Sequence, residues 1–289
     1  MPASFYVNIV LTGVLAGLVY GLMALGLSVI FGVVRVVNFA HGELTVAAMF
    51  AAFFLATGTG LDPLIVLPVV AGGLFLVGYE LQRWVINPFI GRPEHEQFVL
   101  LVAVSMIVLN ALLLAFGPDA RHVNLPYAYD SFELGPILLD KVRVYAAGMA
   151  VLLAALLFAY FRFTLWGKAI RAAADNLTGA MVIGLDIRRL YQATFGLGAA
   201  CVGAAGALLI LILDATPALA PQFTMLAFVI VIIGGLGSMS GALVGGVLIG
   251  VSEAISGFLF SSSMKSMVSF GLLIVVLLFR PQGIMGRRA

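Results

Sequence analysis

Charged residues are scarce in this chain. They make up 10% of its 289 residues, whereas 63% are hydrophobic and the mean hydropathy is +1.16. Soluble domains carry about 25% charged and roughly 45–50% apolar residues, so the solvent of this chain is predicted to be largely lipid. The net charge of +2 indicates no charged partner, and no nucleic acid is expected to bind. Cys201 is the only cysteine, which excludes a disulfide within one chain.

The sequence also lacks the motifs of nucleotide-binding proteins and hydrolases. Gly167-Lys168 is followed by Ala169, and Arg162 stands where a Walker A loop needs glycine. No HExxH motif, no pair of catalytic carboxylates and no Gly-x-Ser-x-Gly sequence occurs. The histidines are too far apart for a metal-ligand spacing: His41, His95 and His122. We therefore expect no catalytic residue, no metal site and no cofactor on this chain.

Long apolar runs replace those motifs. A membrane β-barrel would show ten-residue segments of alternating polarity, so continuous apolar runs predict helices. We expect an all-α integral membrane protein, a polytopic bundle of about 8–9 transmembrane or half-membrane helices that forms one domain over residues 1–289. Glu43–Thr57 and Thr224–Gly234 are short enough to be half-helices. The predicted segments are Tyr6–Val33, Glu43–Thr57, Pro63–Trp84, Gln97–Phe116, Lys141–Phe163, Leu190–Leu213, Thr224–Gly234, Gly241–Phe258 and Met264–Phe279.

The basic residues predict the orientation. With the N-terminus outside and nine alternating segments, eleven of the fifteen Lys and Arg residues fall on the cytoplasmic side, as the positive-inside rule requires. The C-terminus is then cytoplasmic. The eleven are Arg35, Arg83, Arg92, Arg162, Lys168, Arg171, Arg188, Arg189, Arg280, Arg287 and Arg288.

A polar cytoplasmic stretch at about residues 164–189 is the first candidate functional segment. Its small residues follow one another at steps of four, which on a helix would make one narrow face that another backbone can approach. Asp175 or Asn176 suits the cap of a second short helix that stops at Gly184. This pattern fits either a plug for a groove in a soluble partner or an amphipathic loop on the lipid headgroups. The candidate residues are Gly167, Lys168, Arg171, Ala172, Asp175, Asn176, Ala180 and Gly184.

Two interruptions of the apolar segments are candidate parts of a pathway. Paired interruptions of this kind often mark a substrate site at the membrane midplane, and ionisable residues in a membrane usually face a cavity or a partner. The alternatives are that the polar residues mark the cytoplasmic interface and that the glycines permit close helix crossings, as Gly241 with Gly245 and Gly246 with Gly250 are expected to do. The candidates are Asn38, Phe39, His41, Glu43, Gly234, Gly235, Gly237 and, in a later segment, Glu253.

Four stretches resemble the permeases of branched-chain amino acid ABC importers. The first is Gly167-x3-Arg171-Ala172 with Asn176, Ala180 and Gly184, which is similar to the coupling loop of that family. The others are residues 17–48, which include Val37-Asn38-Phe39-Ala40-His41-Gly42-Glu43, residues 227–242 around Ile233-Gly234-Gly235-Leu236-Gly237-Ser238, and Arg280-Pro281-Gln282-Gly283-Ile284-Met285-Gly286. The chain departs from the family at Ser240, where proline is usual, and at Val102-Ala103-Val104-Ser105-Met106.

This resemblance implies a transport subunit of the bacterial inner membrane. Its partners would be a second permease, either a homologue or a second copy, two cytoplasmic ATP-binding subunits that hold ATP and Mg²⁺, and a periplasmic binding protein. That protein would dock near Asp119–Asp140 and Asp214–Gln222. Branched-chain amino acids are the implied substrates, while amides, urea and small carboxylates remain open. If the narrow face of small residues at about 164–189 binds the ATPase subunits, Ala180→Arg should abolish that association without affecting membrane insertion.

Three other functions compete with this interpretation. A secondary transporter driven by an ion gradient would need several acids in the membrane, and Glu253 is the only acid deep in a predicted segment. An integral-membrane enzyme would need clustered nucleophiles and bases at one membrane face, which the sequence does not show. A sugar permease of the wider ABC superfamily is the third.

Overall fold

The computed structural model describes residues 3–135, 137–260 and 264–286. Within them, eight helices are long and apolar enough to cross a membrane, and α11 is shorter. The expected polytopic helical fold is confirmed. Arg287 and Arg288, which the orientation argument used, lie outside the described residues. We call these eight and the shorter α11 together the membrane-scale helices: α1 (Ala3–Val34), α2 (His41–Thr59), α3 (Pro63–Leu81), α4 (Glu94–Phe116), α5 (Lys141–Phe163), α8 (Ile187–Leu209), α9 (Ala220–Gly234), α10 (Met239–Leu259) and α11 (Lys265–Phe279).

The two segments expected to be half-helices are longer in the structure. α2 begins at His41 and has 19 residues. A 3₁₀ turn, Pro217–Leu219, leads into α9, so that this apolar segment reaches 18 residues. Both helices were underestimated because their first turns are polar or contain proline, and an apolar run does not include such turns.

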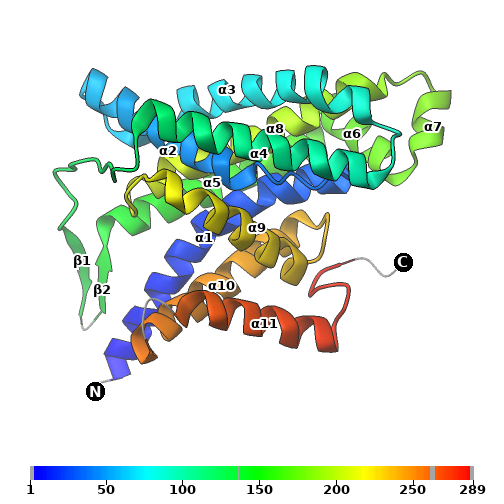
Figure 1. Ribbon diagram of the computed structural model, residues 1–289. Helices are drawn as coiled ribbons and strands as arrows, with labels where there is room; N and C mark the ends of the chain where they lie inside the picture. Colours follow the sequence, from blue (N-terminus) through cyan, green and yellow to red (C-terminus); the bar gives the residue numbers. More distant parts are fainter. Residues whose placement is uncertain (1–2, 136, 261–263, 287–289) are drawn as a thin grey trace.

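The bundle has two different ends (Figure 1). One carries a short antiparallel hairpin of β1 (Ser131–Leu134) and β2 (Ile137–Asp140), together with the start of α1. The other carries α6 (Leu165–Asp175), α7 (Leu177–Val182) and the segment that follows α11. Sequence analysis assigned the corresponding segments to opposite sides of the membrane, and the structure separates them in the same way.

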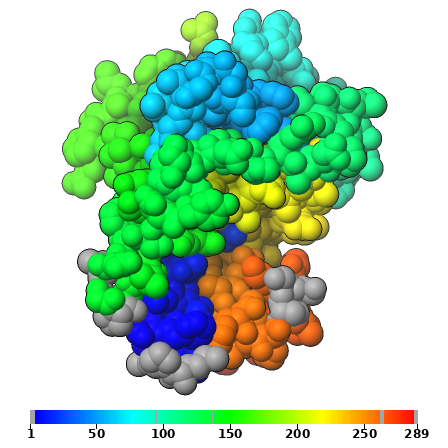
Figure 2. Space-filling model, turned by 90° about the vertical axis from the view of Figure 1, so that its left-hand side faces the viewer, coloured from blue at the N-terminus to red at the C-terminus, as the bar shows by residue number. Residues whose placement is uncertain are grey.

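The loop before the hairpin covers its end of the bundle. Figure 2 views this end and shows residues 117–135 and 137–140 lying across it, between the α2–α3 turn and the start of α1. The hydroxyl of Tyr127 donates a hydrogen bond to Asp62, which also caps α3 by accepting from the Leu64 amide at 2.8 Å. Burial and this bond raise the pKa of Tyr127 above its usual value. The loop is therefore tied to the α2–α3 turn.

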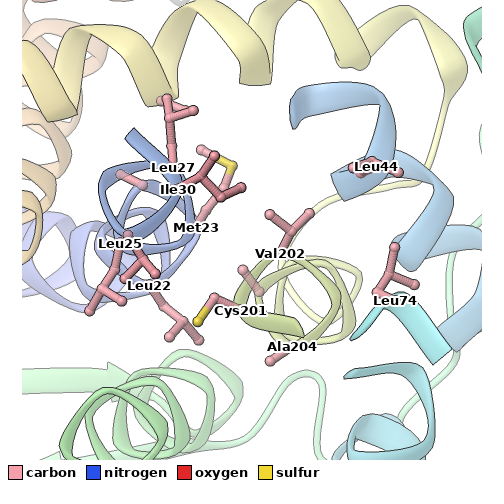
Figure 3. Packing of buried hydrophobic residues seen from close by; sticks show 14 of the residues in the cluster. Leu22, Met23, Leu25, Leu27, Ile30, Leu44, Leu74, Cys201, Val202 and Ala204 are labelled. Carbon is pink, nitrogen blue, oxygen red and sulfur yellow. The ribbon is translucent and has the colours of Figure 1, made fainter. Parts of the chain in front are cut away.

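Helix α8 is the centre of the bundle. Its successive glycines meet three different helices: a Cβ on Gly198 would lie 2.7 Å from the Gly26 oxygen of α1, and one on Gly206 would lie 2.5 Å from the Ala48 Cβ of α2. A Cβ on Gly203 would lie 2.9 Å from the Leu74 Cβ of α3. Figure 3 shows Cys201, Val202 and Ala204 of α8 among side chains from α1, α2 and α3. Small residues thus permit three close crossings on one helix.

A further close crossing joins α1 to α10. A Cβ on Gly246 would lie 2.5 Å from the Gly21 Cα, and one on Gly250 would lie 2.5 Å from the Gly17 Cα. On the neighbouring face of α10, a Cβ on Gly245 would lie 2.6 Å from the Ile230 oxygen of α9. The prediction that the glycine pairs of this segment serve close helix packing is confirmed.

Candidate functional site

The connection from α1 to α2 turns back into the bundle. Arg35 has a φ of 57°, in the left-handed region, and residues 35–40 are not helical. The connection returns so far that Nε2 of His41 lies 3.0 Å from the backbone oxygen of Met23. Met23 precedes the end of α1 by eleven residues, which is about 16 Å at 1.5 Å per residue. Helix α2 therefore begins about halfway through a hydrocarbon core of roughly 30 Å.

Glu43, in the first turn of α2, is held by hydroxyls from two other helices. Its side chain is buried, and Ser105 Oγ of α4 donates to Oε1 at 2.8 Å. Thr224 Oγ1 of α9 donates to Oε2 at 3.1 Å. Ser105 is eleven residues from the start of α4 and Thr224 ten from the end of α9, so both lie about 15–16 Å from those helix ends. Three helices thus place this carboxylate at mid-depth.

A very close approach of α2 to α9 makes this arrangement possible. The Gly42 amide donates to Thr224 Oγ1 at 2.9 Å, and a Cβ on Gly42 would lie 2.0 Å from the Ala220 oxygen. Any larger residue would push the helices apart. The Thr224 hydroxyl has one proton to give, and its distance to Phe39 O is 3.4 Å. The shorter contact, to Glu43, is the one it can satisfy best.

Unpaired polar atoms gather near the same connection. The Met23 carbonyl can only accept, so Nε2 of a neutral His41 carries the proton and Nδ1 is a bare acceptor. Among the described residues neither that Nδ1 nor Asn38 Nδ2 has a hydrogen-bond partner, although both side chains are fully buried. Asn38 Oδ1 accepts from the Ala40 amide at 3.1 Å. Buried polar atoms without partners are rare and need an explanation, such as a functional role.

A cavity of about 1300 Å³ lies at the end of the bundle that carries α6. Its walls come from the end of α1, the α1–α2 connection, the start of α4, α6, and the turn between α9 and α10. Glu43, Ser105 and Thr224 are not part of its lining. The charged and polar side chains of the wall are Ser28, Arg35, Gln97, Lys168, Arg171, Asp175, Ser238 and Ser240.

Three aromatic rings meet beside the cavity, and two of them, Phe39 and Phe98, line it. Phe39 lines the cavity, and its ring centroid lies 4.8 Å from that of Phe98 and 5.2 Å from that of Phe228. The backbone oxygen of Phe39 faces Thr224. An aromatic cluster (Phe39, Phe98 and Phe228) thus borders the cavity, and the backbone of Phe39 connects it to the polar cluster (Glu43, Ser105 and Thr224).

The glycine-rich interruption between α9 and α10 lies against the same cavity. Gly235 and Gly237 have positive φ values, 106° and 77°, and Gly237 lines the cavity. The segment after α11 docks here: the Ile284 amide donates to the Ile233 oxygen at 2.8 Å, and the Met285 amide to the Gly234 oxygen at 3.0 Å. These bonds satisfy carbonyls that the end of α9 leaves without helical partners. Met285 itself lines the cavity.

The polar stretch at 164–189 forms two short helices, as predicted. The Thr164 hydroxyl caps α6 by accepting from the Gly167 amide at 3.0 Å, and Asn176 Oδ1 caps α7 by accepting from the Gly179 amide at 2.8 Å. Gly184, with a φ of 83°, follows the end of α7. A Cβ on Gly167 would lie 2.4 Å from the Tyr160 oxygen, so glycine is needed where α6 folds back against α5.

The prediction of one small-residue face on this stretch is wrong. The chain leaves the helical conformation at Asn176, with φ −148° and ψ 97°, so residues on either side of it do not share a face. Ala172 is exposed, whereas Ala180 is only 3% exposed. An arginine at 180 would therefore disturb the chain's own packing. What the two helices expose instead is a set of large apolar side chains, the apolar foot: Leu165, Trp166, Leu177, Met181, Val182 and Ile183.

Glu253 does not join the other candidates. It lies on α10 among groups of α11, where its carboxylate interacts with Lys265 and Ser269. The Lys265 chain passes over Gly257, one turn further along α10, where a Cβ would lie 2.7 Å from Lys265 Cε. Glu253 is thus placed beside a basic residue and outside the cavity.

Sequence reasoning missed the partners of Glu43. Ser105 and Thr224 are separated from it by 62 and 181 residues, and the rings of Phe98 and Phe228 were also not predicted to meet Phe39. The available signal was a single hydroxyl in an apolar segment, ten or eleven residues from a helix end. A polar residue at that depth would have drawn attention to both.

Two kinds of comparison bear on these observations. A family model described as "Branched-chain amino acid transport system / permease component" matches residues 9–277. The chain is 29% identical to the "High-affinity branched-chain amino acid transport system permease protein BraD" of Pseudomonas aeruginosa, with 99% of this chain and 98% of that protein covered.

Two further relatives extend the comparison. The chain is 29% identical to the "High-affinity branched-chain amino acid transport system permease protein LivH" of Escherichia coli, with 98% of this chain and 96% of that protein covered. It is 24% identical to the "Fructose import permease protein FrcC" of Rhizobium meliloti, with 70% of this chain and 57% of that protein covered. No solved structure matches the chain significantly.

Proposed function

This chain belongs to the family of branched-chain amino acid permease components, and from that premise we propose that it passes a branched-chain amino acid across the inner membrane of a bacterium. The chain is a permease subunit of an ABC importer, a multi-pass membrane protein and not an enzyme. The substrate is proposed because relatives matched over nearly their whole length are named for branched-chain amino acid transport, whereas the fructose permease is covered over 57%.

A permease of such a system works with other components of the system. We propose a second permease, two ATP-binding subunits that hold ATP and Mg²⁺, and a periplasmic binding protein. The apolar foot supports the proposal of ATP-binding subunits, because six large apolar side chains stand exposed on and directly after two short helices at one end of the bundle. Exposed apolar clusters of this kind mark contacts with other proteins or with lipid. The binding protein would dock on the opposite end, near residues 119–140 and 214–222.

The orientation is part of the proposal. The end with α6 and α7 would face the cytoplasm, and the end with the hairpin would face the periplasm. Two observations support this assignment. Most basic residues fall at the α6 end in the predicted topology, and the structure separates the hairpin from α6 and α7 as that topology requires.

The cavity suggests how the import cycle uses this chain. It lies at the proposed cytoplasmic end and has Phe39 in its lining, which supports an inward-facing state. ATP binding would bring the ATPase subunits together, and the apolar foot would carry that movement into α5 and α8. The pathway would then pass the α1–α2 connection (Asn38, Phe39, His41 and Glu43) and the glycine interruption (Gly234, Gly235 and Gly237).

Reconstitution tests the energy source and the substrate together. The permeases, their ATPases and the binding protein are placed in proteoliposomes, and uptake of L-leucine is measured with and without ATP. We expect uptake only with ATP and the complete set of subunits. Uptake by the permease alone under an ion gradient would instead support a secondary transporter, and uptake of fructose but not leucine would support a sugar permease.

A pair of exposed substitutions tests the orientation and the docking sites. Val182 of the apolar foot is 81% exposed, and Leu138 of the hairpin is 54% exposed. Val182→Arg should abolish co-purification of the ATPase subunits and leave binding-protein docking intact. Leu138→Arg should do the reverse. If Val182→Arg co-purifies the ATPases as well as the unmodified chain, the apolar foot is not the ATPase contact.

A further inference from the structure

Glu43 is a buried carboxylate whose observed partners are all neutral. It is 2% exposed, and none of the ion pairs among the described residues includes it. Its two hydrogen bonds come from hydroxyls. Removing a charged carboxylate from water is costly, and neutral donors repay only part of that cost. The site is therefore suited to a positive group that arrives from outside the chain.

We propose that Glu43 binds the ammonium group of the transported amino acid halfway across the membrane. This inference rests on the proposed function and names the chemistry by which the pathway recognises its substrate. Ser105 and Thr224 act as positioning residues, because each holds one carboxylate oxygen in place from a different helix. A substrate passing here would thus contact α2, α4 and α9 at once.

The hydrogen-bonding capacity of the carboxylate supports this role. An ionised carboxylate has about four acceptor positions, and an ammonium group has three donors. Only one hydroxyl bonds to each oxygen of Glu43, so acceptor positions remain for the ligand. The α1–α2 connection also carries Asn38 Nδ2, a buried donor without a partner that suits the carboxylate end of the same molecule.

The aromatic cluster supplies the remaining features of such a site. Phe39 and Phe98 line the cavity, Phe228 packs against Phe39, and an aliphatic side chain can pack against these rings. Ring faces also attract cations, which favours an ammonium group on its way to the carboxylate. Because Phe39 lines the cavity and its backbone oxygen lies 3.4 Å from Thr224 Oγ1, a substrate that moves from the cavity to Glu43 would pass this residue.

This chemistry divides the substrates that the sequence left open. Amino acids carry an ammonium group, and they should bind. Urea, amides and simple carboxylates lack one, and they should not. An ammonium site at Glu43 would thus favour amino acids over the other candidates.

Three probes that share the branched aliphatic chain of leucine test the proposal. L-Leucine carries both charged groups, 3-methylbutylamine lacks the carboxylate, and 4-methylpentanoate lacks the ammonium group. Binding of radiolabelled L-leucine is measured on the complete permease–ATPase complex in nanodiscs, without the binding protein. We expect unlabelled leucine and, more weakly, 3-methylbutylamine to compete, and 4-methylpentanoate not to compete.

Glu43→Gln is the decisive variant, because it keeps the shape of the side chain and removes its charge. We expect it to weaken leucine binding at least about tenfold, the effect of losing a charge-assisted hydrogen bond. Glu253→Gln is the matched control, since it neutralises an acid that lies outside the cavity, and it should bind leucine as the unmodified complex does. Co-purification of the ATPases shows whether each variant assembles.

The outcomes are separable from those of the proposed function. Unchanged leucine binding by an assembled Glu43→Gln complex, effective competition by 4-methylpentanoate, or no saturable leucine binding would each overturn the assignment. If Glu43→Gln does not assemble, the competition series on the unmodified complex still decides. ATP-dependent leucine uptake by proteoliposomes with the unmodified chain is measured in parallel. It shows whether the proposed importer function holds even if the assignment of Glu43 is wrong.

Discussion

Helices α8 and α4 have almost the same length, yet the protein uses them in opposite ways. α8 has 83% of its most apolar 18-residue window buried, and α4 has 11%. α4 is nevertheless the more apolar of the two, rich in leucine and valine, whereas α8 is rich in glycine and alanine. In a membrane protein, therefore, the most hydropathic helix is not the central one. Small residues mark the interior, because lipid already satisfies large apolar side chains.

The contrast also separates two roles. α8 holds three helices together through its glycines and has no residue in the polar cluster. α4 contributes Ser105 to Glu43 and Phe98 to the aromatic cluster, although it packs loosely against the rest of the chain. A helix that packs loosely against its neighbours can shift relative to them, which suits the wall of a pathway.

The largest effect is expected from emptying the centre of the bundle. Phe195 of α8 is 0% exposed, so Phe195→Ala would leave a cavity that its neighbours cannot fill and should destabilise the fold by about 3–5 kcal/mol. Unfolding can be followed by the reaction of Cys201 with a fluorogenic thiol reagent, because this single cysteine is buried in α8. Phe270→Ala, at a 43% exposed position of α11, is the control and should lower the midpoint far less. Equal shifts would contradict the central role of α8.

The second prediction overfills the same helix. A Cβ at 198 would lie 2.5 Å from Ile30 Cγ1, so Gly198→Leu should force α8 away from α1 and cost about 1–3 kcal/mol. Gly148→Leu in α5 is the matched control, because a Cβ there meets nothing within 4 Å. The same thiol assay compares their unfolding midpoints. If both variants unfold at the same temperature, close packing at Gly198 does not matter to stability.

The third prediction concerns the polar link of α4. Ser105→Ala would remove one of the two hydroxyls bonded to Glu43 and should destabilise the protein by about 1–2 kcal/mol. Because Ser105 positions the carboxylate, the maximal rate of leucine uptake in proteoliposomes should fall as well. Ser105→Thr keeps the hydroxyl and should recover most of both properties. Loss of neither property in Ser105→Ala would show that α4 is not linked to the pathway through this bond.

The smallest effect is expected on the outer face of α4. Leu114 is 89% exposed, so Leu114→Ala removes apolar surface that already faces the surroundings and should change stability by no more than about 0.5 kcal/mol. The unfolding midpoint measured in lipid nanodiscs provides the check. A loss as large as that of Phe195→Ala would mean that another protein covers this face and that α4 is less peripheral than it is within the single chain.

Much of the fold could be predicted from the sequence, because each helix is indicated by the pattern of its own residues. Apolar runs located all nine membrane-scale helices, and Asn176 and Gly184 correctly marked the start and the end of the second short cytoplasmic helix. The failures came where geometry depends on one backbone conformation. The extended residue at 176 splits the small-residue series, and this turns Ala180 inward, which no periodicity argument could reveal.

The candidate site was predictable only in part. The α1–α2 connection and the glycine interruption could be identified because polar residues and glycines interrupt apolar segments. Their meeting with Ser105 and Thr224 could not, since it depends on how α4 and α9 pack against α2 over long sequence separations. Glu253 was a candidate either for a cavity wall or for pairing near the outer surface, and the structure places it beside Lys265 of the following helix.

The docking of Ile284 and Met285 onto the end of α9 has a consequence for biosynthesis. The carbonyls that these residues satisfy belong to Ile233 and Gly234, about fifty residues earlier in the chain. At roughly 5–20 residues per second, several seconds of translation separate the two halves of this contact. In a nascent chain the contact of Ile284 and Met285 with the end of α9 is therefore absent while α10 and α11 enter the membrane. The part of the cavity wall that this contact supplies can form only afterwards.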